Sequence, residues 1–241
     1  MRVILIADVH ANWEALLSLQ RAEQKPDAVL FAGDAVGYGP DPANCARWLL
    51  ANTTAAVRGN HDDAVYRSEG EGMCFGVPTE LAPAAREMIA YSRQFLSAHD
   101  LNGIGSWPLS TSVALGGAHF YLVHGSPADP LCGQVNPATC SEAELHALFD
   151  GITADVIALG HTHMPALRSF DGRLIINPGS LGQPRYGTPD ATYAVWEDGQ
   201  IQIKHLHYDH DATVNRLRLA SFSPEVTEQL AGILETGLLI Y

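Results

Sequence analysis

The segment Val3-Ile4-Leu5-Ile6-Ala7-Asp8-Val9-His10 decides the fold. Its first five residues form a short apolar run rich in β-branched side chains, which is typical of a strand buried on both faces. Asp8 and His10 follow at once, and residues i and i+2 of an extended chain share a face. One carboxylate and one imidazole can therefore reach the same ion. The segment predicts a buried strand that ends in a metal-binding pair.

The first 60 residues repeat a pattern of strand and helix. Residues 11–24 have apolar side chains at helical spacing, Pro26-Asp27 interrupts them, and residues 28–32 predict a second buried strand. A turn rich in Pro and Gly leads into a helix over about 43–51, and residues 54–57 predict a third strand. Strands that alternate with helices indicate parallel β-α-β units.

The rest of the chain is richer in strands. After a helix over 79–98, strands are expected near 111–115, 118–123, 155–159, 173–176, 192–196 and 200–206, with helices near 141–149, 210–219 and 224–235. We therefore predict an α/β fold with two facing mixed β-sheets, a β-sandwich flanked by helices. We expect a single domain over residues 1–241, with a helical C-terminal extension over about 208–241. Whether that extension covers the site or extends the core stays open.

The composition is that of an ordinary globular protein. Hydrophobic residues make up 46% of the 241 residues and charged residues 17%. The net charge of −13 repels polyanions, so we expect no general coating of nucleic acid. Bound cations can still make a pocket attractive to a small phosphorylated substrate. No apolar run approaches the ~18 residues that span a bilayer.

The cysteines bear on the compartment of the protein. Cys45, Cys74, Cys132 and Cys140 form no CxxC pair and no dense framework, which favours reduced thiols over a disulfide scaffold. The N-terminal apolar stretch is too short for a secretory signal. We therefore expect a cytoplasmic protein that does not associate with membranes. Its oligomeric state stays open.

Metal-binding residue types follow a predicted strand at five places. The five segments are Asp8-Val9-His10, Gly33-Asp34, Gly59-Asn60-His61-Asp62, His124-Gly125 and Gly160-His161-Thr162-His163. In open α/β sheets, ligands gather at the carboxyl ends of the strands. We therefore expect these five segments to converge on one crevice.

The donors in these segments are carboxylates, imidazoles and one amide, without a thiolate. Such a set suits Mn²⁺, Fe²⁺, Zn²⁺, Ni²⁺ or Co²⁺ and is poor for a Ca²⁺ cage. Seven donors are more than one metal needs if positions stay open for water. Two metals ~3.5–4 Å apart can share a bridging carboxylate and activate one water for in-line displacement at phosphorus. The sequence therefore predicts two divalent transition-metal ions, with Mn²⁺ as the expected metal.

In order and spacing, the five segments resemble the signature of the calcineurin-like metallophosphoesterase superfamily. The resemblance runs from residue 3 to about residue 205 and implies that superfamily's four-layer architecture. Two stretches look like its small bacterial and archaeal phosphodiesterase-like branch: Gly33-Asp34-x-Val36-Gly37-Tyr38-Gly39-Pro40 and Asn177-Pro178-Gly179-Ser180-Leu181-Gly182-Gln183-Pro184-Arg185. The ordered set carries the resemblance, because GNH or GHxH alone is a weak signal.

The resemblance implies a role for each metal ligand. The first metal would be held by Asp8, His10 and His163, and the second by Asn60, His124 and His161, with Asp34 bridging the two. Each residue alone has an ordinary interpretation, because a lone Asp-x-His can be loop polarity and a lone histidine can be a core residue. All of these interpretations would have to hold together to remove the site.

Four further residues have implied roles beside the metals. His61 would donate a proton to the leaving oxygen or stabilise the charge that develops there. Asp62 would orient the His61 imidazole. Arg58 and Arg185 are candidate contacts to the substrate phosphate.

Other polar and aromatic residues match no position of the signature. The remaining histidines are interpreted as structural or surface residues: His99, His119, His146, His205, His207 and His210. The turn at Asn177-Pro178-Gly179-Ser180 is interpreted first as a chain reversal and second as a wall of the site. Trp13, Tyr38 and Tyr186 could stack a nucleotide base, but each is as easily a core or rim residue.

The resemblance to the phosphodiesterase-like branch implies hydrolysis of a small phosphodiester, and the expected nucleophile is a hydroxide that bridges two metals. The expected partner is thus a small phosphoester. Phosphomonoesters, including phosphoserine and phosphothreonine peptides, stay open as alternatives. The other alternative is a catalytically silent binding scaffold of the same fold. Such a scaffold usually lacks ligands or the GNH histidine, whereas this chain has all seven ligands and His61.

Overall fold

The strands form two five-stranded mixed sheets in the computed structural model, which describes residues 1–68 and 82–239. In order across the first sheet, the strands are β10 (Gln200–Leu206), β9 (Ala191–Glu197), β1 (Arg2–Ile6), β2 (Ala28–Phe31) and β3 (Ala55–Ala56). Across the second they are β4 (Ser110–Leu115), β5 (Ala118–Val123), β6 (Val156–Ala158), β8 (Arg173–Asn177) and β7 (Ala166–Phe170). In the first sheet β1, β2 and β3 are parallel, and β9 pairs antiparallel with both β1 and β10. In the second sheet β5, β6 and β8 are parallel, and the edge strands β4 and β7 pair antiparallel with their neighbours.

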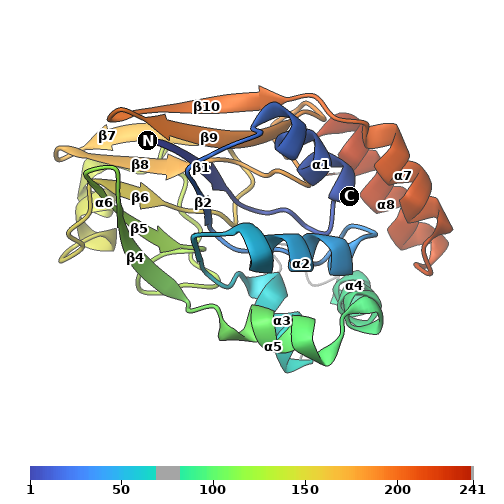
Figure 1. Ribbon diagram of the computed structural model, residues 1–241. Coiled ribbons are helices and arrows are strands. Elements are labelled where there is room, and N and C mark those ends of the chain that lie inside the picture. The colour runs from blue at the N-terminus through green and yellow to red at the C-terminus, as the bar shows by residue number, and fades with distance from the viewer. Residues whose placement is uncertain (69–81, 240–241) are drawn as a thin grey trace.

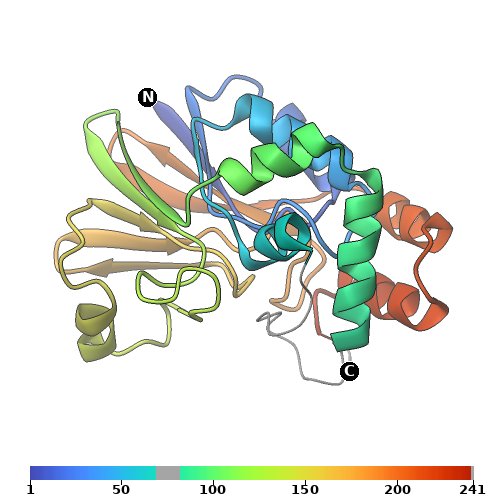
Figure 2. The same cartoon turned by 90° about the horizontal axis from the view of Figure 1, so that it is seen from below.

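Helices cover the outer faces of both sheets. They are α1 (Trp13–Ala22), α2 (Pro42–Asn52), α3 (Asn60–Arg67), α4 (Ala82–Phe95), α5 (Ala98–Ser106), α6 (Glu142–Leu148), α7 (His210–Leu219) and α8 (Pro224–Thr236). Figure 1 shows α7 and α8 side by side at one end of the molecule and α6 at the other. α3 packs against both α4 and α5 (Figure 2).

The alternation of side chains along β1 explains the layers. Val3 and Leu5 point into the core between the two sheets, whereas Ile4 and Ile6 point into the core beneath the helices. On the second sheet, Phe120 faces the first sheet, and Ile157 packs in the core that includes residues of α6. Strands buried on both faces read as continuous apolar runs. The predicted α/β fold of two facing sheets flanked by helices is confirmed.

The parallel strands of both sheets end at one edge of the sandwich. The His124 Nδ1 atom, after β5, lies 2.8 Å from the carbonyl oxygen of Ala32, which follows β2 in the other sheet. Asn177, at the end of β8, donates its side-chain amide to the carbonyl of Gly160, which follows β6, at 2.7 Å. Five loops far apart in the sequence therefore meet at this edge.

Three elements were missed by the sequence analysis: α3, α5 and β7. The buried side of α3 is largely polar, from Asn60 to Asp63, so no apolar period marks the helix. α5 contains Gly103 and Gly105, which weaken helix propensity. Here glycine is needed for close packing, because a Cβ at Gly105 would lie 2.4 Å from the ring of Tyr66. β7 is a short strand with Arg and Ser between its apolar residues.

The C-terminal helices form where the sequence predicted them, and they extend the core. Val214 and Leu217 of α7 and Leu230 and Leu234 of α8 belong to the same apolar cluster as Ile4 of β1. α7 also packs against α1. Within residues 1–68 and 82–239, no helix has the combination of length and apolar content that crossing a bilayer requires.

One expectation about the cysteines is wrong. Cys132 is disulfide-bonded, so the four cysteines are not all reduced thiols. Cys45 and Cys140 are free, and Cys74 lies outside the described residues. Spacing along the chain does not reveal which cysteines meet in space, which is why the sequence pattern misled.

Candidate metal centre

Several of the predicted metal-binding residues lie on turns with left-handed backbone. The residues with positive φ include Asp8 (53°), His10 (44°), Asp34 (64°), His161 (69°) and His163 (58°). This region costs an L-residue ~1–3 kcal/mol, and Asp, Asn and His tolerate it best. Backbone bonds hold the turns, because the N–H of Asp8 donates to the carbonyl of Gly33 at 2.9 Å and that of His10 to the carbonyl of Asp34 at 3.0 Å. The surrounding fold therefore imposes these conformations.

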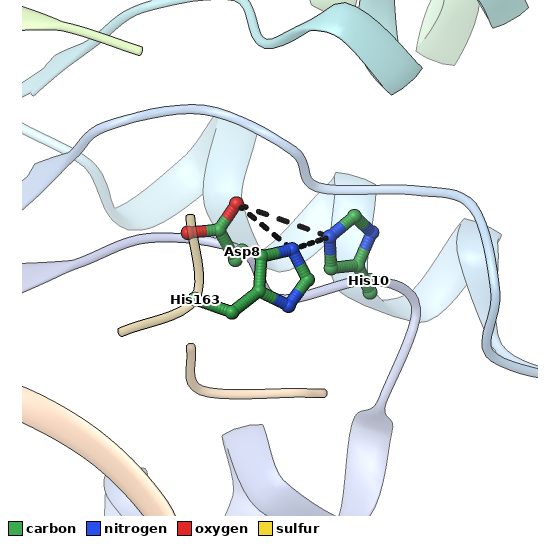
Figure 3. Close-up of side chains that lie close together, drawn as sticks. All are labelled: Asp8, His10 and His163. Atoms are coloured by element: carbon green, nitrogen blue, oxygen red, sulfur yellow. Dashed lines mark hydrogen bonds and ion pairs between the residues drawn. The ribbon is translucent and has the colours of Figure 1, made fainter. Parts of the chain in front are cut away.

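Asp8, His10 and His163 form one group of buried side chains (Figure 3). His163 Nε2 lies 3.5 Å from Asp8 Oδ1 and 3.0 Å from His10 Nε2, and His10 Nε2 lies 3.9 Å from Asp8 Oδ1. Asp8 Oδ2 is buried and accepts no hydrogen bond among the described residues. The group joins the end of β1 in the first sheet to the loop after β6 in the second.

Hydrogen bonds fix the tautomers of the two imidazoles in this group. Nδ1 of His163 donates to the carbonyl of Gln183 at 2.6 Å, and Nδ1 of His10 donates to the carbonyl of Val36 at 3.0 Å. A carbonyl only accepts, so each neutral ring carries its proton on Nδ1. Burial lowers the pKa of both His10 and His163, which keeps the rings neutral. Two Nε2 lone pairs thus face each other at 3.0 Å, an arrangement that a coordinated cation stabilises.

Asn60, His124 and His161 form a second group next to the first. Asn60 Oδ1 lies 2.9 Å from His124 Nε2 and 3.1 Å from His161 Nδ1. Asp34 lies between the groups, with its Oδ2 3.3 Å from His124 Nε2 and 3.7 Å from His10 Nε2. The seven side chains predicted as metal ligands therefore lie close together, and Asp8 and His124 also form a possible ligand group with Asp34 across the two groups.

The electrostatics of the cluster favour bound positive charge. Burial raises the pKa of Asp34, but His124, His61 and His10 outweigh it and hold that pKa well below its usual range. Burial lowers the pKa of His124, yet Asp34 raises it to about 9. Burial raises the pKa of Asp8 to about 8. Buried carboxylates next to imidazoles without a thiolate fit divalent transition metals, which would supply the missing positive charge.

His61 lies beside both groups. Its ring centroid is 4.9 Å from that of His10 and 4.4 Å from that of Tyr38, and its backbone N–H donates to Asp34 Oδ1 at 2.9 Å. Burial lowers the pKa of His61 to about 4, so its imidazole is neutral. With His10 and Asp34 it also forms a possible ligand group. This position beside the candidate ligands allows either the role predicted for His61 or direct binding of a metal.

Asp62 binds backbone rather than the imidazole of His61. Its two carboxylate oxygens accept N–H groups of Asp34 (2.9 Å), Ala35 (2.9 Å), Val36 (3.3 Å) and Gly59 (3.1 Å). Among the described residues no hydrogen bond joins Asp62 to the His61 ring. Asp62 therefore holds the loop of Asp34 against the start of α3. The predicted contact between the Asp62 carboxylate and the His61 ring is not formed among the described residues.

The two arginines predicted to contact phosphate have different surroundings. Arg58 forms an ion pair with Asp63 at 2.9 Å and donates to the carbonyl of Gly105 at 2.6 Å. Its guanidinium therefore links α3 to α5 and contacts none of the seven candidate ligands among the described residues.

Arg185 lies at the cluster. Its Nε and Nη2 lie 3.1 and 2.6 Å from Gln183 Oε1, and its guanidinium carbon lies 5.5 Å from the ring centroid of Tyr38. Burial first, and then the charge of Arg185, lowers the pKa of His163. Among the described residues, no carboxylate forms an ion pair with Arg185. The positive charge of its guanidinium therefore has no negatively charged partner there.

The loop from Asn177 to Arg185 is part of the site as well as a chain reversal. The Ser180 hydroxyl donates to the carbonyl of Asp8 at 2.7 Å, and the carbonyl of Gln183 accepts from His163. Gly182 is required by close approach, because a Cβ there would lie 1.8 Å from the carbonyl oxygen of Val9. The sequence analysis did not single out Gln183, because the atom that binds His163 is a backbone carbonyl and carries no residue signal.

Comparisons with known proteins identify the family and the fold. Residues 1–198 match the model of the calcineurin-like phosphoesterase superfamily domain. A probable metallophosphoesterase of Mycoplasma pneumoniae is 25% identical and covers 87% of this chain and 99% of its own. The crystal structure of a metallophosphoesterase from Sphaerobacter thermophilus has a TM-score of 0.78 and 29% identity, covering 96% of this chain and 98% of that one. A hypothetical protein from Pyrococcus horikoshii, 19% identical and covering 98% of each chain, shares the fold with a TM-score of 0.82.

Proposed function

Because the chain belongs to the calcineurin-like phosphoesterase superfamily, we propose that it is a two-metal phosphoesterase that hydrolyses a small phosphodiester. The observation that carries the proposal is the meeting of seven buried oxygen and imidazole donors from five loops: Asp8, His10, Asp34, Asn60, His124, His161 and His163. Their division around Asp34 supports two ions rather than one.

Three residues of the chain have proposed roles in such a reaction. The chemistry that two divalent cations supply when bound is polarisation of the phosphoryl oxygens and activation of water as a nucleophile at neutral pH. Arg185 would bind a substrate oxygen with a charge-assisted hydrogen bond. His61 would donate a hydrogen bond from its neutral ring N–H to the leaving oxygen and stabilise the negative charge that develops there. Asp62 would keep the Asp34 loop in place.

Metal analysis combined with an ester panel tests the proposal. The purified protein should bind two equivalents of Mn²⁺ or a related ion and hydrolyse bis-p-nitrophenyl phosphate faster than p-nitrophenyl phosphate. A preference of tenfold or more for the monoester would replace the diesterase by a phosphomonoesterase. Two bound ions without turnover of either ester would favour the binding scaffold. No uptake of any transition metal would end the proposal.

Two matched arginine variants test the substrate contact. Arg185→Gln should raise the KM for bis-p-nitrophenyl phosphate about tenfold, the scale of one lost charge-assisted hydrogen bond of about 1.5 kcal/mol. Arg58→Gln should leave the KM near that of the wild type and lower the melting temperature, because Arg58 links α3 to α5. An effect of Arg58→Gln on KM as large as that of Arg185→Gln would show that the assignment of the two side chains is wrong.

A further inference from the structure

Asn12 is a fully buried junction of four parts of the molecule. Its side-chain Nδ2 donates to the carbonyl of Gly182 at 2.8 Å and lies 3.1 Å from the hydroxyl of Tyr208. Its Oδ1 accepts from the backbone N–H of Ala15 and from the hydroxyl of Thr213, both at 3.1 Å. All the hydrogen-bonding capacity of the amide is thereby used.

These bonds connect the two segments that hold the first candidate metal group. Asn12 caps the N-terminus of α1 and stands two residues after His10. Gly182 precedes Gln183, whose carbonyl fixes the ring of His163 at 2.6 Å. The distance between His10 Nε2 and His163 Nε2 therefore depends on how far the loop of His10 lies from the loop of Gln183. The side-chain amide of Asn12 connects these two loops.

The C-terminal helices supply the other half of the junction. Thr213 belongs to α7, is fully buried, and also lies within hydrogen-bond distance of Glu14 (3.3 Å). Arg216, one turn later, forms ion pairs with Glu14, at 2.8 Å, and with Asp41. Behind His10 and Tyr38, the side chains of Leu217, Leu230 and Leu234 line the same small pocket as Asn12 and Gln183. These helices lie beyond residues 1–198, where the chain matches the superfamily model.

We propose that Asn12 is a positioning residue for the ion held by Asp8, His10 and His163, and that α7 completes this site by fixing Asn12 through Thr213. The inference rests on the proposed two-metal function. Outer hydrogen bonds that orient ligands typically contribute 10–100-fold to metal affinity. The helical extension is therefore a structural component of the metal site, although none of its side chains is a ligand.

The test removes the hydroxyl of Thr213 without changing its shape. In the full-length protein, Mn²⁺ binding is measured by calorimetric titration, and retained metal is measured by elemental analysis after dialysis. Thr213→Val should weaken one of the two ions about tenfold and leave the other unchanged. Thr213→Ser keeps the hydroxyl and should bind both ions as the wild type does. Thr227→Val is the matched control, because among the described residues the Thr227 hydroxyl donates to the carbonyl of Ser223, the N-cap of α8, and to no residue of the junction.

A second variant approaches the junction from Asn12. Asn12→Asp keeps the side-chain acceptor that caps α1 and loses the donor to Gly182, so it too should weaken one ion by about 10–100-fold. Melting of the metal-free variants reports whether they fold. Wild-type affinities in both Thr213→Val and Asn12→Asp would overturn the inference, and so would equal losses in Thr213→Ser and Thr213→Val. A wild-type protein that binds neither Mn²⁺ nor any other divalent transition metal would instead refute the proposed function itself.

Discussion

His61 lies within reach of His10 and Asp34 as a possible ligand, and its neutral ring could instead donate a hydrogen bond to the leaving oxygen. In the second case His61→Ala should retain both metals and lower kcat by about 10²–10³, the scale of one lost donor to a developing negative charge. Elemental analysis and steady-state kinetics on the same preparation check the two halves of the prediction. If the variant loses an ion, His61 is a ligand and its assigned role is wrong.

Asp34 lies between the two groups of candidate ligands, and a carboxylate that bridges two metal ions must carry a negative charge. Asp34→Asn keeps the shape of the side chain but removes the negative charge that His124 and His10 face at 3.3 and 3.7 Å. We expect metal binding or activity to be abolished, because a neutral amide oxygen is a weak bridging ligand. Calorimetric titration with Mn²⁺ measures the effect. Unchanged affinity and turnover would remove Asp34 from the centre.

At the level of elements, α5 offers a pH-dependent interaction away from the candidate metal ligands. Burial raises the pKa of Asp100, but hydrogen bonds from Arg47 and Ser97 outweigh it and lower that pKa to about 2. A lowered carboxyl pKa contributes stability above the unfolded value of about 3.8, and that stability is lost as pH falls from about 4 to about 2. The contribution at pH 7 is about 1–2 kcal/mol after allowance for the exposed Arg47.

Asp100→Asn should therefore lower the free energy of unfolding at pH 7 and flatten its decline between about pH 4 and 2. Urea denaturation across that pH range measures both effects. Asp171→Asn is the matched control, because Asp171 is 63% exposed in its ion pair with Arg173 and should contribute little. Equal effects of the two substitutions on the free energy of unfolding would show that the buried ion pair of Asp100 is no more stabilising than an exposed one.

At the scale of the whole molecule, the candidate ligands come from both sheets. Asp8 and His10 follow a strand of the first sheet and His163 follows one of the second, so an ion held by all three connects the sheets. Saturating Mn²⁺ at 100 times its Kd should stabilise the fold by about 2.7 kcal/mol per ion. That is a rise of about 5–10 °C in melting temperature per ion for a protein of this size, reversed by EDTA. Identical melting curves with and without EDTA would argue against structural coupling.

The sequence predicted those features that a short segment specifies by itself. An apolar run followed by a donor identified β1, β2, β5 and β6 together with the candidate ligands at their ends. Contacts between distant segments were not predictable in this way. Asp62 binds four backbone N–H groups, and Arg58 and Arg185 differ only in which distant residues surround them. Asn12 was not singled out from the sequence, because its bonds to Gly182 and Thr213 depend on the folded chain.

The left-handed turns at Asp8, His10, Asp34, His161 and His163 restrict how this centre can evolve or be redesigned. To hold the proposed ions, the amino acid at each of these positions must both supply a donor atom and tolerate a positive φ angle. Exchange of an imidazole for a thiolate, which would favour softer metals, would add a conformational penalty to the change in coordination chemistry. Asp, Asn and His are the side chains that satisfy both requirements, so retuning toward another metal is easiest by swaps among these three.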